Sequence, residues 1–193
     1  MRHRTLLPLL LLTAGCPALD VGQPIELVPR GWGATDIQVL RQSAACWNLQ
    51  YGTRLVVQDD VDWPQQVQVA FSDFVCVYAA GQTNPTLPVT VHLCPPERYV
   101  GVLGNYRERL LFEVVLHELG HVLNIRRHAA DPLAVMASGA QKKSLDQMVL
   151  AGFAPQDHEL FHDANPDVTL HPTCDGVVVD RLADVPSCSC PHY

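Results

Sequence analysis

An uninterrupted helical segment, residues 106–123, is the feature of this sequence that most constrains its fold. The segment has no proline and one glycine, and as a helix it would be roughly 27 Å long. Asn105 can cap its N-terminus, with Glu108 three residues later as in a capping box. Asn124 is suited to end it, because asparagine tolerates the left-handed conformation that follows a helix. Apolar residues on more than one side of the segment predict a helix in the interior of a domain.

Shorter segments with strand and helix patterns surround this helix. We expect strands at residues 24–28, 55–57, 67–71 and 89–93, and helices at residues 35–49 and 155–161. Residues 81–88 contain glycine, asparagine and proline, and are expected to form a loop. The chain after Pro166 is expected to be irregular and tied by disulfides. A length of 193 residues, 48% of them hydrophobic, suits one α+β domain.

The first residues have the order of a secretory signal peptide: arginines, an apolar stretch too short to span a bilayer, and small residues. The run that ends at Cys16 resembles a bacterial lipobox, which implies cleavage before Cys16 and acylation of its sulfur. Thr13 stands where that motif usually has leucine, so an ordinary secretory signal is the alternative. We expect a signal peptide at 1–15, a lipid-anchored tether at 16–24 and a single domain at 25–193. The expected location is the bacterial cell envelope, at the outer membrane, or otherwise outside the cell.

Six cysteines follow Cys16, namely Cys46, Cys76, Cys94, Cys174, Cys188 and Cys190. An even number in an exported chain favours three disulfides, which can be paired in 15 ways. Cys188 and Cys190 are too close in sequence to pair comfortably with each other. No Cys-x-x-Cys pair is present, which argues against a structural zinc site made of cysteines. The formal charge of −7 excludes the basic footprint of a nucleic-acid-binding protein.

Two histidines lie four residues apart near the end of the predicted long helix. His117 and His121 therefore project from one face, where their imidazole nitrogens can bind one zinc ion. Glu118 is placed beside the first histidine, where it can take a proton from zinc-activated water instead of binding the metal. This is the chemistry of the His-Glu-x-x-His motif, and the motif lies on a helix, as it requires.

A catalytic zinc site needs a third protein ligand and an open position, and His128 and Asp131 follow closely enough to supply that ligand. The run from His117 to His128, with Met136 beyond it, resembles the signature of the metzincin peptidases, and most closely that of the matrixins. The resemblance implies His128 as third ligand and Met136 as the methionine that packs beneath the metal. Asn124 replaces the family's glycine. One extra residue, which we expect to bulge in the turn, places Arg127 where the family has its histidine; Asp131 is then the fallback ligand.

The resemblance implies a zincin fold with a twisted mixed sheet, a long active-site helix and a small C-terminal part with a late helix. It also implies an antiparallel edge strand that binds an extended peptide, for which residues 89–93 are the candidate. His92 in that segment is interpreted as a surface or substrate-contact residue. We therefore expect a zinc-dependent endopeptidase that acts on peptides or proteins; the sequence does not specify an oligomeric state. The alternatives are a non-catalytic envelope lipoprotein that uses a degenerate zincin scaffold as a binding module, and a purely structural zinc site.

Overall fold

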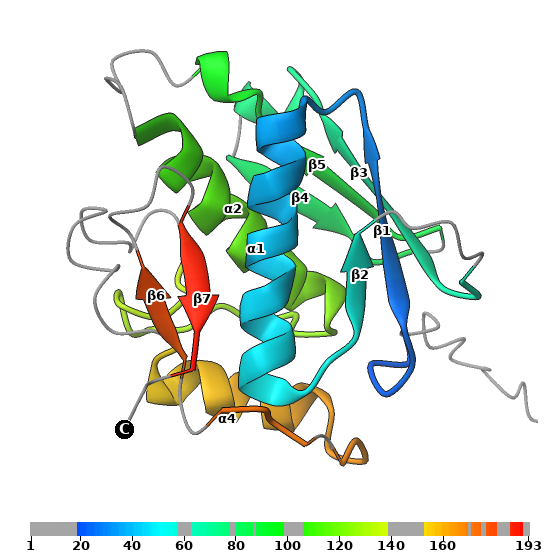
Figure 1. Cartoon of the computed structure of the whole chain (residues 1–193), viewed down its shortest axis with the longest axis vertical. Helices are drawn as coiled ribbons and strands as arrows, with labels where there is room; N and C mark the ends of the chain where they lie inside the picture. Colours follow the sequence, from blue (N-terminus) through cyan, green and yellow to red (C-terminus); the bar gives the residue numbers. More distant parts are fainter. Residues whose placement is uncertain are drawn as a thin grey trace, which may run out of the picture.

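The computed structural model describes residues 19–57, 63–77, 80–86, 88–98, 106–138, 153–169, 171–174, 177–180 and 186–190. In this part of the chain a five-stranded mixed sheet packs with three α-helices, beside a small two-stranded sheet (Figure 1). The large sheet contains β1 (Ile25–Arg30), β2 (Leu55–Val57), β3 (Gln66–Phe71), β4 (Gly81–Asn84) and β5 (Thr90–Leu93). The helices are α1 (Ala34–Tyr51), α2 (Tyr106–Val122) and α4 (Pro155–Ala164). The predicted α+β class is confirmed.

The strands of the large sheet lie in the order β2-β1-β3-β5-β4. All neighbouring pairs are parallel except β4 and β5, which are antiparallel. The predicted loop at residues 81–88 is therefore wrong for its first half, where β4 forms the edge strand. The proposed edge at residues 89–93 is also wrong, because β5 lies between β3 and β4. The sequence of β4, Gly-Gln-Thr-Asn, has no apolar alternation, and an edge strand that packs small residues against a helix does not need one.

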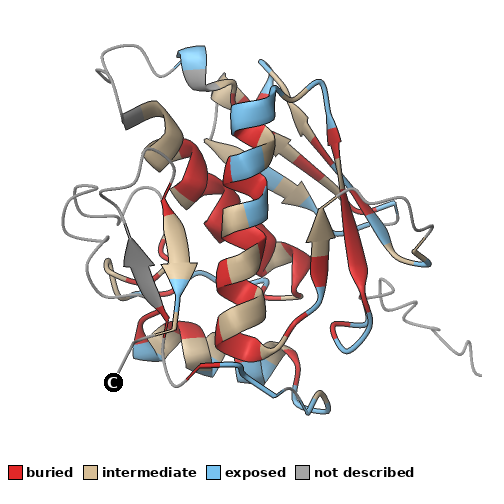
Figure 2. Cartoon of the chain, viewed as in Figure 1, coloured by how far each residue is buried: buried red, intermediate tan, exposed pale blue. Residues whose placement is uncertain are grey.

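Helices α1 and α2 cover one face of the sheet. In β3 the side chains of Val67 and Val69 are buried while Gln66 and Gln68 are exposed, and in β5 buried residues alternate with half-buried ones. Figure 2 shows buried residues along α1, α2 and the strands behind them. Most of the hydrophobic core therefore lies between this face and the two long helices.

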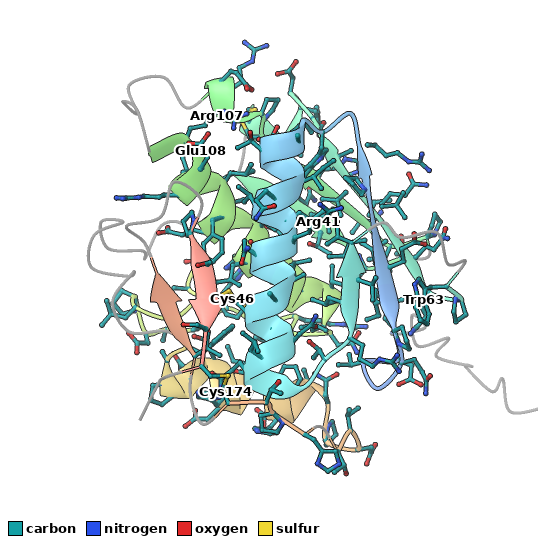
Figure 3. The ribbon with its side chains drawn as sticks, in the orientation of Figure 1. Arg41, Cys46, Trp63, Arg107, Glu108 and Cys174 are labelled. Carbon is teal, nitrogen blue, oxygen red and sulfur yellow. A yellow bond between two sulfur atoms is a disulfide. The ribbon has the colours of Figure 1, made fainter. Side chains whose placement is uncertain are left out.

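Helices α1 and α2 run side by side in the same direction. The guanidinium of Arg107 lies 2.8 Å from Asp36 Oδ1 at their first turns, and this pairing raises the pKa of Arg107. Farther along, Trp47 Nε1 donates to the carbonyl of Leu116 over 2.9 Å. Arg107 and Glu108 mark the start of α2 in Figure 3, at the opposite end of the helix from the two histidines. The predicted helix at residues 106–123 is confirmed; its expected cap, Asn105, lies outside the described residues.

Three disulfides hold the fold, as predicted. They join Cys46 to Cys188, Cys76 to Cys94, and Cys174 to Cys190. Cys188 and Cys190 thus pair elsewhere and not with each other, as expected.

The bond at Cys46 ties α1 to β7 (Ser187–Ser189), which pairs with β6 (Val178–Asp180) (Figures 1 and 3). The prediction of an irregular C-terminal region is wrong for this two-stranded sheet. Three disulfides indicate an extracytoplasmic protein. The helices in the described ranges lack the combination of length and apolar character that a membrane span needs. Cys16, the predicted lipid site, lies outside those ranges.

Candidate metal centre

Three histidines come together at the end of α2. The side chains of His117 and His121 project from the last turns of the helix, and His128 reaches them from the segment that follows. The ring centroids are 4.9 Å apart for His117 and His121, 5.2 Å for His117 and His128, and 5.1 Å for His121 and His128. One ligand atom from each residue lies within 4.8 Å of the other two. This triangle of imidazoles can hold a metal ion.

Backbone carbonyls orient two of the three rings. Nδ1 of His117 lies 2.8 Å from the carbonyl oxygen of Val135, and Nδ1 of His121 lies 2.5 Å from that of Ile125. A carbonyl only accepts, so each Nδ1 must carry the proton, which leaves the Nε2 lone pair for a metal. Burial lowers the pKa of His121, and the hydrogen bond to Ile125 opposes this only in part. Burial thus favours the neutral form of His121, and the hydrogen bonds at Nδ1 select the tautomer whose Nε2 is free to bind a metal.

The turn after α2 is built on Asn124. Its φ of 68° is left-handed, as predicted. The amide of Ile125 donates to the carbonyl of Gly120, and that of Asn124 to the carbonyl of His121, so α2 ends in a Schellman motif. The side chain of Asn124 donates to the carbonyl of Leu19 and to Oδ1 of Asn165. Asparagine therefore supplies the left-handed conformation and also ties α2 to the N-terminal segment and to the end of α4.

The extra residue before His128 is accommodated outside the cluster. The chain bends at Arg127, whose exposed guanidinium pairs with Asp163 of α4 at 2.8 Å. Directly after His128, the amide of Ala129 donates to the carbonyl of Met136 over 2.9 Å, and Ala129 forms a bridge with Ala137. This closure anchors the segment at His128, which is exposed to solvent and completes the histidine triangle.

Met136 packs against the helical turn that carries the histidines. Its side chain is fully buried. A Cβ added to Gly120 would collide with the sulfur of Met136 and would lie 3.1 Å from the ring of Trp47. Glycine in a helix costs about 1 kcal/mol relative to alanine. Gly120 is suited to this position because it lets the thioether reach the backbone between His117 and His121.

A buried carboxylate from α4 holds the segment around Met136. Asp157 is 0% exposed and accepts hydrogen bonds from the amides of Val135, Met136 and Ala154, each 2.9 Å long. Burial raises the pKa of Asp157, and the three amides oppose the shift. Because the carbonyl of Val135 accepts a hydrogen bond from Nδ1 of His117, Asp157 is connected to the metal centre through one residue. We did not expect this role from the sequence, where the only signal is an aspartate two residues after the proline that begins α4.

The side chain of Glu118 extends from α2 to the edge strand β4. Its side chain is buried, with the residue 4% exposed. One carboxylate oxygen, Oε2, accepts a hydrogen bond of 2.6 Å from the hydroxyl of Thr83 in β4. The expected base thus directly follows the first histidine and contacts β4, the strand whose position the sequence did not predict.

Other candidate residues lie apart from the cluster. Among the described residues, the three histidines are the one group of metal-binding side chains that comes together. The fallback ligand Asp131 instead accepts from the amide of Leu133 in a local turn. His92 lies half-buried in β5, opposite Gln82 of β4. The structure thus brings together the three histidines that the sequence singled out.

No family model matches this chain, and a search of the curated proteins finds no similar sequence. What is established is a cluster of three histidines at the end of a helix, beside a mixed five-stranded sheet, with the composition of a metal site.

Proposed function

We propose that this protein is a zinc-dependent endopeptidase. The observation that carries the proposal is the histidine triangle, with a buried glutamate directly after its first member. A binding module on a degenerate scaffold would be favoured by a turn that held His128 away from the other two histidines. The three nitrogens instead lie close enough to share one ion, which supports the peptidase. A purely structural site would not need a carboxylate beside its first ligand.

His117, His121 and His128 would hold the metal. Three neutral imidazoles suit zinc, and a site with three protein ligands keeps a fourth position open for water or substrate. The hydrogen bonds of Nδ1 to backbone carbonyls, seen for His117 and His121, are typical of metal-binding histidines. When bound, zinc would supply a Lewis acid that polarises a carbonyl and makes water acidic near neutral pH.

Glu118 would act as general base and then as general acid. Its carboxylate would take a proton from the attacking water and deliver it to the nitrogen of the departing amine. Thr83 occupies one lone pair of Oε2, and a carboxylate has several such sites, so accepting this hydrogen bond is compatible with proton transfer.

The outer edge of β4 would bind the substrate. Among the described residues β4 is the last strand of the sheet and pairs only with β5, and its Thr83 contacts Glu118 of α2. A peptide added to this edge would be held extended by main-chain hydrogen bonds, largely independent of its side chains. Residues 142–148, which would shape side-chain preference, lie outside the described ranges.

The order of elements supports a metzincin-like zincin fold. A long helix carries two of the ligands, a left-handed turn leads to the third, and a buried methionine packs beneath the helix. We further propose that Cys16 anchors the protein to the bacterial outer membrane through lipid. The three disulfides support an oxidising location, and the lipobox-like sequence at Cys16 supports the anchor.

The test is metal analysis together with cleavage of a mixed peptide library by the chain from residue 17 onward. We expect one zinc per chain, cleavage that a chelator stops, and recovery when zinc is restored. Glu118→Gln should lower cleavage by at least about 100-fold while zinc stays bound. Glu108→Gln, at the far end of the same helix, is the matched control. Zinc binding without cleavage would favour the binding module, and failure to bind zinc at neutral pH would overturn the metal site.

A further inference from the structure

Strand β4 touches the expected base through two residues on one face. Gly81 and Thr83 are two positions apart, so both point toward α2. A Cβ added to Gly81 would lie 2.7 Å from Cγ of Glu118 and 2.8 Å from its Oε1. Such distances leave no room for a side chain. The absence of one at Gly81 is therefore what allows the strand to approach the carboxylate this closely.

Thr83 supplies a directed hydrogen bond at the same place. Its Oγ1 lies 2.6 Å from Oε2 of Glu118 and 3.2 Å from the carbonyl oxygen of the same residue. A hydroxyl has one proton to donate, and the shorter contact has the length of a hydrogen bond to an ionised carboxylate. Thr83 therefore donates to the side chain of Glu118 and fixes the direction of its carboxylate.

We propose that Thr83 is a positioning residue that holds Glu118 in its reactive orientation, with Gly81 making the space. The catalytic meaning of this contact rests on the proposed peptidase function; the contact itself does not. The hydroxyl of Thr83 acts on the base through Glu118, and a peptide at β4 would be held by the main chain, which a change of side chain leaves in place. Loss of its hydroxyl should therefore lower kcat and leave KM and zinc affinity unchanged.

The kinetic test compares three threonine substitutions. Thr83→Val, which keeps the shape and removes the hydroxyl, should lower kcat by about tenfold to 100-fold, the range expected when a reacting group is misplaced. Thr83→Ser should restore most of the loss, because serine keeps the donor. Thr90→Val is the matched control, because Thr90 lies in β5 at a position that faces away from α2. Thr83→Ala removes the same hydroxyl and replaces the valine variant if that does not fold.

A second measurement needs neither metal nor activity. Thr83→Val, Glu118→Met and the double variant form a cycle in urea unfolding of the metal-free chain. A hydrogen bond to a charged group should appear as a coupling of about tenfold to 100-fold in the unfolding equilibrium constant. If the cycle shows coupling but the wild-type chain cleaves no peptide, the peptidase function would be refuted while the contact between Thr83 and Glu118 would stand. Additive effects in the cycle, or a Thr83→Val enzyme as fast as Thr83→Ser, would overturn the positioning role.

Discussion

Replacement of Asp157 should damage the fold and the metal centre together. Its buried carboxylate accepts three amide hydrogen bonds, two at Oδ2 from Val135 and Ala154 and one at Oδ1 from Met136. Asparagine has a similar shape but only one accepting oxygen. If that oxygen takes the place of Oδ2, the amide nitrogen faces the N–H of Met136, and two donors meet without an acceptor.

The cost follows from these contacts. A buried polar group left without a partner costs about 1–3 kcal/mol, and the two surviving hydrogen bonds lose the strength that the charge gave them. We expect Asp157→Asn to lower the free energy of unfolding by about 2–5 kcal/mol. Typical domains have roughly 5–15 kcal/mol in total, so the variant should still fold but melt early.

The metal centre should weaken as well. The carbonyl that orients His117 belongs to Val135, whose amide Asp157 holds. Loss of outer partners of metal ligands typically lowers metal affinity by about 10- to 100-fold. We expect zinc affinity to fall within this range when it is measured by chelator competition at a temperature where the variant is fully folded.

Asp163→Asn is the control for both measurements. Asp163 lies on the same helix but is exposed and pairs with exposed Arg127, so its removal should change stability by less than about 1 kcal/mol. If Asp157→Asn matched Asp163→Asn in urea unfolding and in zinc affinity, the connection from α4 to the histidines would be refuted.

Three further predictions concern the ligands, pH and disulfides. His128→Ala should weaken zinc binding at least tenfold and Asp131→Asn should not; the reverse order in zinc titrations would make Asp131 the ligand. Burial lowers the pKa of His158 below its usual 6.5, so the unfolded chain takes up this proton first as pH falls. The stability that His158 contributes is thus present above pH 6.5 and is lost as the pH falls through its lower native pKa. His158→Gln should make the free energy of unfolding less dependent on pH in this range, as measured in urea on the metal-free chain. Replacing Cys46 and Cys188 with alanine should cost about 4–5 kcal/mol, because their bond closes a loop of 142 residues, and an unchanged melting temperature would contradict this.

The parts of the site that follow one another along the chain could be predicted from the sequence. Helical periodicity placed His117 and His121 on one face, and the tolerance of asparagine for positive φ predicted the turn at Asn124. These depend on local geometry, which a short stretch of sequence determines. The position of His128 does not follow from local geometry but from a resemblance, and the exposed bend at Arg127 accommodates the extra residue.

The parts that depend on distant contacts could not be predicted. Strand β4 lacks the apolar alternation of a half-buried strand because its inner face consists of Gly81 and Thr83, which suit contact with Glu118 and contribute little to a core. Asp157 looks like an ordinary acidic residue in the first turn of a helix until the fold brings Val135 and Met136 to it. Pairing among six cysteines likewise requires the tertiary structure.

Metal binding by the histidines and proton transfer by Glu118 depend on contacts with different parts of the fold, so the two functions should be separable. The histidines are held by the segment after α2 and, through Val135, by Asp157 of α4, whereas Glu118 is held by Thr83 of β4. In the part of the chain that the structure describes, no hydrogen bond joins Thr83 to Asp157. Asp157→Asn should therefore reduce zinc affinity more than turnover at saturating zinc, and Thr83→Val should do the opposite. Effects of the two substitutions that add within error in the double variant would support this division, since coupling between them would require a shared partner.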